Sequence, residues 1–324
     1  MTGIQKISVP NFRTHSGTFF NSIKLYYQHF GQALGKSPVV LVNHSLTGDA
    51  QVCGPNGWWK EIIGTGKTID TQYYAVLAFN IPGNGTKGQI FSDVEDFHAG
   101  DIASLFLKGL DVLKIDKLYA LIGGSIGGGI GWEMAALSPN LMQYLIPVAA
   151  DWKANDWIIA NTFLQKRILE NSKNPIEDAR IHAMLTYRTP ESFSSRFGRS
   201  KNSDLGIYNI ESWLLHHAKK LAYRFDLASY LMVNHLLASI NIERSGNNAF
   251  EIIKKINAEI HLIAVKSDLF FISQEDQNTY EMIKPHKDNI YFHELKSIHG
   301  HDAFLIENEA VAQILKPIFK HQKT

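Results

Sequence analysis

The chain has 324 residues with a formal net charge of +1, and 45% of its residues are hydrophobic. This length suits one large α/β domain with an insertion, or two domains, and the composition is typical of a globular protein with a sizeable core. A near-neutral charge disfavours nucleic acid and anionic membranes as partners. A single cysteine, Cys53, excludes an intrachain disulfide and a thiolate-rich metal site, so no metal is expected.

Two further features of the sequence point to the reducing cytoplasm. The amino-terminal residues lack the basic start and apolar core of a signal peptide. No run of about 18 apolar residues could form a transmembrane helix. Together with the single cysteine, these features predict a cytoplasmic protein.

Strand and helix patterns alternate through the first 150 residues. Short apolar runs, typical of buried parallel strands, predict strands at 24–30, 38–43, 73–80, 118–122 and 144–150. Helical spacing of apolar residues predicts helices at 101–113 and 128–137. This alternation predicts an α/β fold with a mostly parallel sheet covered by helices on both faces.

The pattern changes after residue 150. Residues 151–248 hold no convincing strand, and helices are predicted at 157–169, 177–187, 210–221 and 227–240. Strands return at 260–265 and 289–295, followed by helices at 274–283 and 303–319. We therefore predict an α/β core built from 1–150 and 249–324. The helical insertion, 151–248, should lie over the edge where such sheets bind ligands.

The segment from Gly123 to Gly127 reads Gly-Gly-Ser-Ile-Gly and fits the pattern G-x-S-x-G. It lies between a predicted strand and a predicted helix, which is the context that makes Ser125 a candidate nucleophile. Glycine is needed at both ends because a side chain would clash at a sharp, strained turn. The alternative is a glycine-rich turn with no catalytic role. Whether Ser125 has a base and an acid as partners decides between these two interpretations.

A serine hydroxyl needs a base, and the base needs an orienting carboxylate. In folds of this kind the chain order is Ser, acid, His. Asp268 directly follows the predicted strand at 260–265 and is the candidate acid. His299 and His301 both follow the last strand, and we prefer His301 because it directly abuts the last predicted helix.

The developing oxyanion needs two backbone N–H donors. One donor is expected from Ile126, directly after the nucleophile. The other is expected from Leu46, in the loop after the strand at 38–43. His44 lies in the same loop, where a core or supporting histidine is the simpler interpretation, and it is given no catalytic role.

Several motifs in order resemble the homoserine O-acyltransferases of methionine biosynthesis. They lie at 42–52, 57–59, 66–71, 123–128, 185–189, 195–199, 224–231 and 300–305. The resemblance implies an α/β-hydrolase fold with an inserted helical lid. It also implies ping-pong transfer of an acetyl group from acetyl-CoA, through Ser125, to L-homoserine, with no permanently bound cofactor.

The resemblance also assigns residues that bind the amino acid. Arg180 matches the family's carboxylate-binding arginine, and a guanidinium suits a carboxylate because it donates two parallel hydrogen bonds. Tyr187 lies about two helical turns later on the same face. Asp302 would hold the substrate ammonium. The structural alternative for Arg180 is a surface cation paired with Glu177 or Asp178.

The sequence leaves alternative functions and the oligomeric state open. An esterase or thioesterase would use the same triad with water as the acceptor, and a non-catalytic hydrolase-like binding protein is a third class. Within acyl transfer, serine as acceptor and succinyl-CoA as donor stay open. The family implies a homodimer through the lid helices, where Trp213, Leu214 and Leu215 could supply an apolar face or instead line the lid core.

Overall fold

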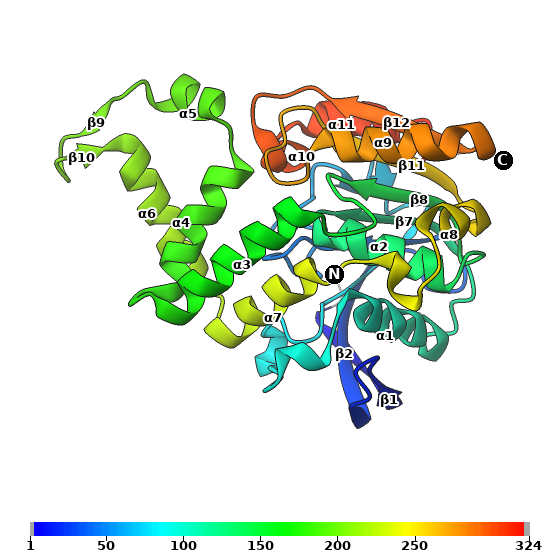
Figure 1. Ribbon diagram of the computed structural model, residues 1–324. Coiled ribbons are helices and arrows are strands. Elements are labelled where there is room, and N and C mark those ends of the chain that lie inside the picture. The colour runs from blue at the N-terminus through cyan, green and yellow to red at the C-terminus, as the bar shows by residue number, and fades with distance from the viewer. Residues whose placement is uncertain (1–2, 321–324) are drawn as a thin grey trace.

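The computed structural model describes residues 3–320, and its centre is an eight-stranded sheet (Figure 1). Neighbours from β6 to β12 pair in parallel, whereas β1 and β2 are antiparallel. The spatial order is β1 (Gln5–Arg13), β2 (Phe19–Gly31), β6 (Ala75–Phe79), β3 (Val39–Asn43), β7 (Leu118–Gly124), β8 (Met142–Val148), β11 (Glu259–Val265) and β12 (Ile290–Leu295). The predicted mostly parallel α/β sheet is confirmed.

Both faces of the sheet are buried, which explains the continuous apolar runs of its strands. In β3, Leu41 belongs to the hydrophobic cluster on one face, and Val40 and Val42 belong to the cluster on the other. The first cluster includes residues of α1 (Ala99–Val112), α2 (Ile126–Leu137) and α8 (Ala249–Lys255). The second includes residues of α11 (Asn308–Leu315), β4 (Ile63–Gly64) and β5 (Ile69–Asp70).

Five α-helices lie within residues 151–248, which follow β8 in the chain, and we call this part the inserted segment. Its helices are α3 (Asp156–Asn171), α4 (Pro175–Tyr187), α5 (Pro190–Phe197), α6 (Asn209–Ala222) and α7 (Leu227–Ala238). Their starts follow from capping chemistry: proline opens α4 and α5, and Asn155 and Asp226 accept hydrogen bonds from the first turns of α3 and α7. Figure 1 shows α5 projecting away from the sheet.

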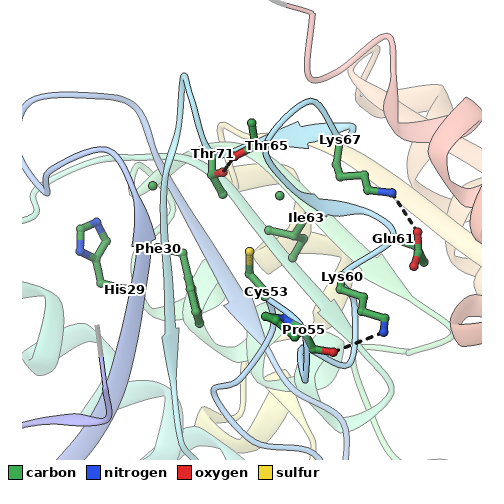
Figure 2. Close-up of a pocket in the computed structure, with 13 residues that line it drawn as sticks. His29, Phe30, Cys53, Pro55, Lys60, Glu61, Ile63, Thr65, Lys67 and Thr71 are labelled. Atoms are coloured by element: carbon green, nitrogen blue, oxygen red, sulfur yellow. Dashed lines mark hydrogen bonds and ion pairs between the residues drawn. The ribbon is translucent and has the colours of Figure 1, made fainter. Parts of the chain in front are cut away.

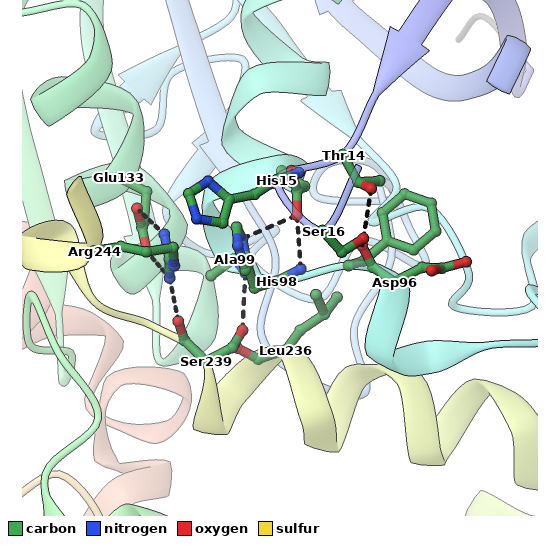
Figure 3. Close-up of polar contacts among 12 residues, drawn as sticks. Thr14, His15, Ser16, Asp96, His98, Ala99, Glu133, Leu236, Ser239 and Arg244 are labelled. Atoms are coloured by element: carbon green, nitrogen blue, oxygen red, sulfur yellow. Dashed lines mark hydrogen bonds and ion pairs between the residues drawn. The ribbon is translucent and has the colours of Figure 1, made fainter. Parts of the chain in front are cut away.

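The end of the inserted segment is fixed to the core by partly buried polar contacts (Figure 3). The Arg244 guanidinium donates to both carboxylate oxygens of Glu133 in α2, at 3.1 and 2.9 Å. The backbone N–H of Asn241 donates to the same carboxylate at 2.9 Å. Ser239 Oγ accepts from the N–H of Ala99 in α1 at 2.9 Å. A charged pair held this way gives a directional attachment between the segment and the core.

The structure departs from the predicted elements at short pieces. Residues 151–248, predicted to hold no convincing strand, contain the antiparallel strands β9 (Lys201–Asn202) and β10 (Ile207–Tyr208). Each has only two residues, which is too short for an alternating apolar pattern to appear in the sequence. The predicted final helix at 303–319 is wrong as one element. It breaks at Glu307, whose ψ of 53° is not helical, into α10 (Ala303–Ile306) and α11.

The structure also contains elements that the sequence pattern did not predict. The strand β1 and the helices α5 and α8 had no predicted counterpart, because their apolar patterns are short or irregular. The remaining predicted strands and helices are confirmed, including α9 (Ser273–Ile283) and the strand–turn–helix unit at Ser125. The loop before α10 contains the short helix η5 (Gly300–Asp302), which was not predicted. No helix in the described part of the chain is long and apolar enough to cross a membrane.

Candidate active site

Ser125 lies at the sharp turn between β7 and α2, with φ of 57° and ψ of −129°. A positive φ at a serine is a strained conformation that surrounding contacts must hold in place. A Cβ on Gly123 would lie 2.4 Å from the carbonyl carbon of Gly127, and one on Gly127 would lie 2.4 Å from the carbonyl oxygen of Asn43. The turn therefore forms only because both flanking residues are glycine, as predicted from the sequence.

Three loops bring Ser125, His301 and Asp268 into one hydrogen-bonded chain. His301 Nε2 lies 2.9 Å from Ser125 Oγ, and His301 Nδ1 lies 2.7 Å from Asp268 Oδ2. All three residues are at most 4% exposed. The second carboxylate oxygen of Asp268 accepts from the N–H groups of Phe270 and Phe271 at 2.7 and 3.0 Å. These bonds fix the carboxylate, and the carboxylate in turn orients the imidazole.

Aromatic rings enclose the imidazole of His301. The ring of Phe271 stacks on it at 5.7 Å between centroids, and Phe270 and Phe304 meet it edge-on at 5.3 and 5.7 Å. The left-handed Gly300 just before it, with φ of 65°, has no room for a Cβ, which would lie 2.9 Å from the Tyr187 carbonyl oxygen. Packing as well as hydrogen bonding therefore holds this ring.

The two histidines of the loop before α10 have different partners. His299 Nδ1 lies 2.9 Å from the hydroxyl of Ser192 in α5, so this ring ties the loop to the inserted segment. His301 is the one that faces Ser125. The preference for His301 over His299 therefore agrees with the geometry, while its role in catalysis stays a prediction.

The two expected oxyanion donors lie beside the nucleophile turn. Ile126 opens α2, so its N–H is one of the helix-start donors without an intrahelical acceptor. Leu46 lies in the loop after β3, and that loop packs on the first turn of α2, since Gly127 has no space for a Cβ against the carbonyl oxygens of Asn43 and His44. Within residues 3–320, neither N–H makes a hydrogen bond to a backbone carbonyl. Their role stays a prediction.

Tyr187 on α4 lies beside His301, and Arg180 on the same helix lies beside Tyr187. The Tyr187 ring centroid is 5.3 Å from that of His301, and the Arg180 guanidinium carbon is 5.7 Å from the Tyr187 ring. In the described part of the chain, Arg180 forms no ion pair with Glu177 or Asp178, so the surface-pair alternative is not the observed geometry. Burial raises the pKa of Tyr187, so its hydroxyl keeps its proton near neutral pH.

Arg188 is a residue of this site that sequence reasoning did not single out. Its Nε donates to Asp302 Oδ2 at 2.9 Å, and its guanidinium lies 5.7 Å from the Trp213 ring centroid. Asp302 was predicted as an ammonium ligand, and the structure gives its carboxylate a cationic partner within the chain. No sequence pattern links positions 114 residues apart, although Arg188 does lie in one of the motifs that resemble the family.

A sizeable cavity lies away from these residues (Figure 2). It holds about 600 Å³ and is lined by residues around the end of β2 and by 53–71. Gly31, in its lining, pairs with Ala75 at the start of β6, so the cavity lies toward the amino ends of the parallel strands. The triad loops follow the carboxyl ends. Burial raises the pKa of the Cys53 thiol in this cavity, which keeps it protonated.

The chain is similar to homoserine O-acetyltransferases along nearly its whole length. It is 30% identical to the protein of Chloroherpeton thalassium, over 96% of this chain and 88% of that protein. It is 31% identical to the protein of Cyclobacterium marinum, over 94% and 91%. The crystal structure of the Staphylococcus aureus homoserine O-acetyltransferase superimposes with a TM-score of 0.83 at 25% identity, over 99% of this chain and 97% of that chain.

The fold is also shared with hydrolases. The alpha/beta hydrolase fold family matches residues 38–203. The crystal structure of esterase E22 superimposes with a TM-score of 0.87 at 20% identity, over 99% of this chain and 100% of that chain, which supports the fold alone. The chain therefore belongs to the homoserine O-acetyltransferase family, within the alpha/beta hydrolase fold.

Proposed function

We propose that this protein transfers the acetyl group of acetyl-CoA to the hydroxyl of L-homoserine through an acetyl-Ser125 intermediate. The observation that carries the proposal is the buried chain from Ser125 Oγ to His301 to Asp268, at 2.9 and 2.7 Å, in a member of this family. An enzyme of this kind needs no permanently bound cofactor, because acetyl-CoA enters as a substrate.

In the first half-reaction, His301 Nε2 removes the proton from the Ser125 hydroxyl as its oxygen attacks the thioester carbonyl. The N–H groups of Leu46 and Ile126 donate to the resulting oxyanion. Collapse of the tetrahedral species breaks the carbon–sulfur bond, and the thiolate leaves with the proton held by His301. Asp268 stabilises the imidazolium between these two transfers and does not itself become protonated.

In the second half-reaction, His301 removes the proton from the homoserine hydroxyl as that oxygen attacks the acetyl-Ser125 carbonyl. The same two N–H groups hold the second oxyanion. The bond between the acetyl carbon and Ser125 Oγ then breaks, and His301 returns its proton to the serine. One base and one oxyanion site therefore serve both steps, as ping-pong chemistry requires.

We propose that the inserted segment acts as a lid and supplies residues that bind the amino-acid substrate. Arg180 would bind the substrate carboxylate, since it forms no ion pair within residues 3–320 and lies beside Tyr187. Tyr187 would lie against the bound amino acid next to His301. Asp302 would bind the ammonium group while sharing its charge with Arg188.

Hydrolysis of an acyl ester or thioester is the second candidate function. The pair between Asp302 and Arg188, at 2.9 Å, favours it, because a carboxylate already paired with a guanidinium attracts a substrate ammonium less strongly. Water would then replace homoserine in the second step. The triad chemistry is otherwise the same, so the acceptor alone separates the two functions.

An assay of thiol release separates these functions. Acetyl-CoA or succinyl-CoA is supplied with homoserine, with serine or without an acceptor, and Ser125→Ala serves as the control. We expect release from acetyl-CoA that rises strongly with homoserine, together with formation of O-acetylhomoserine. Release that is equal with and without either amino acid would identify a hydrolase, and a preference for succinyl-CoA or serine would reassign the donor or the acceptor.

We also propose that the protein works in the cytoplasm as a homodimer that pairs through the inserted segment. Leu185 on α4 and Leu215 on α6 are 50% and 41% exposed, so both are accessible to an apolar contact between subunits. Trp213 instead packs on Phe193 and Phe197 within the segment. The mass of the particle in solution, measured by light scattering, tests this assembly, and a monomer would contradict it.

A further inference from the structure

Both ring nitrogens of His44 have partners, and those partners determine its tautomer. His44 is fully buried. Its Nε2 lies 3.0 Å from the backbone nitrogen of Ile81, and its Nδ1 lies 2.8 Å from the carbonyl oxygen of Ser45. The Ile81 N–H can only donate, so Nε2 accepts, and Nδ1 must carry the hydrogen that is donated to Ser45. Burial lowers the pKa of His44, which keeps the ring neutral.

The Ser45 carbonyl belongs to the same peptide unit as the Leu46 N–H. A trans peptide is planar, so its C=O and N–H point in opposite directions, and there is no cis peptide bond in the described chain. A donor that holds the Ser45 oxygen therefore sets the direction of the Leu46 N–H. The N–H of Gly48 donates to the same oxygen at 2.9 Å, so this carbonyl has two anchors.

The neighbouring residue Asn43 fixes the other side of the site. Its buried side-chain Nδ2 donates to the carbonyl oxygen of Gly127 at 3.1 Å. This bond joins the end of β3 to the first turn of α2, which carries Ile126. Asn43 thus sets how the loop after β3 lies against the nucleophile turn, and the His44 ring sets the direction of the peptide within that loop.

We propose that His44 is a positioning residue that aims the Leu46 N–H at the oxyanion formed on Ser125. It touches neither substrate nor the reacting atoms, and it transfers no proton. The proposal rests on the oxyanion site of the proposed function and is independent of which acyl donor and acceptor the protein uses. It predicts that the bond to Ser45 matters for rate, whereas the bond to Ile81 matters only for stability.

Two substitutions separate the two bonds of this ring. In His44→Asn, the amide nitrogen takes the place of Nδ1 and can still donate to Ser45. In His44→Gln, the amide oxygen takes the place of Nε2 and can still accept from Ile81, but the donor to Ser45 is lost. Each variant keeps one hydrogen bond and loses the other, so the two form a matched pair with similar losses of stability.

The readout is the acylation of Ser125 by p-nitrophenyl acetate, followed as the burst of nitrophenol. A donor removed from an oxyanion site costs about 10²- to 10³-fold in rate, and a misdirected one should cost less. We expect His44→Gln to lower the acylation rate constant by about 10- to 100-fold with little change in KM. His44→Asn should stay within a few-fold of the wild type. Equal rates for the two variants, or a change in KM alone, would overturn the proposal.

A measurement on the unsubstituted protein keeps the proposal testable if either variant folds poorly. The ¹⁵N spectrum of the His44 ring should show a protonated Nδ1 and an unprotonated Nε2 at neutral pH. A protonated Nε2 would contradict the proposal, because it cannot accept from Ile81. A protein that is acylated by the ester but not by acetyl-CoA would refute the proposed function and leave the His44 comparison intact.

Discussion

The core and the inserted segment hold their parts of the site in different ways. His301, on a core loop, makes two hydrogen bonds and is enclosed by three phenylalanine rings. The Arg180 guanidinium, on α4, lies 5.7 Å from the centroid of the Tyr187 ring. His301 is thus held in place within the chain itself, whereas Arg180, proposed to bind the acceptor's carboxylate, forms no ion pair within residues 3–320. Chemistry and specificity should therefore respond separately to substitution.

Ser125→Ala should abolish the chemistry proposed for the core and have the largest effect on activity. Loss of the nucleophile should lower the acyl-transfer rate on the order of 10⁴-fold or more, since a triad acts as a unit. The free energy of unfolding should change by less than about 1 kcal/mol, because the substitution is small and the turn is held by its glycines. Steady-state thiol release and urea unfolding measure the two effects, and near-normal turnover would refute the assignment.

Arg244→Met should break the attachment between the two regions. The Glu133 side chain is 4% exposed and that of Arg244 is 19% exposed, so removing Arg244 leaves a buried carboxylate without its charged partner, at a cost of up to about 3–5 kcal/mol. Arg167→Met is the matched control, since Arg167 is exposed and lies 4.0 Å from Glu170, and it should cost less than about 0.5 kcal/mol. Urea unfolding of both variants tests the contrast, and equal losses would show that the Glu133 pair does not hold the segment.

Arg180→Met should weaken the use of the acceptor, which is the role proposed for the inserted segment, without affecting acylation of Ser125. A charged hydrogen-bonding group contributes about 1.5–3 kcal/mol, so kcat/KM for homoserine should fall by about 10- to 100-fold. The rate of acetyl-enzyme formation should stay close to that of the wild type. Arg180→Lys keeps the charge but not the two-pronged geometry, and it should lie between them. Equal losses in both half-reactions would remove the carboxylate role from Arg180.

A pH dependence of stability gives the smallest effect. Burial, followed by the positive charge of Arg180, lowers the pKa of His217 to about 4, below the value near 6.5 of an unfolded histidine. Between these two values the unfolded chain binds a proton that the folded chain does not, so stability rises with pH across this window. His217→Gln should flatten that rise in urea unfolding, and an unchanged slope would contradict the assignment.

The sequence predicted the core well because its signals are local. Buried strands appear as apolar runs, and the glycines around Ser125 report a turn that tolerates no side chain. The order of Ser125, Asp268 and His301 then follows from the fold. The pairing of Arg188 with Asp302 could not be predicted, because it depends on how α4 meets the loop before α10. The role proposed for His44 likewise needs the Ile81 contact, 37 residues away.

The fate of the acetyl group on Ser125 tests the proposed acetyl-enzyme most directly. The protein is mixed with acetyl-CoA without an acceptor, quenched, and the peptide that carries Ser125 is examined by mass spectrometry. We expect one acetyl group on Ser125 that persists until L-homoserine is added and then leaves as O-acetylhomoserine. An unlabelled Ser125, or a label that is lost at the same rate with and without homoserine, would contradict the proposal.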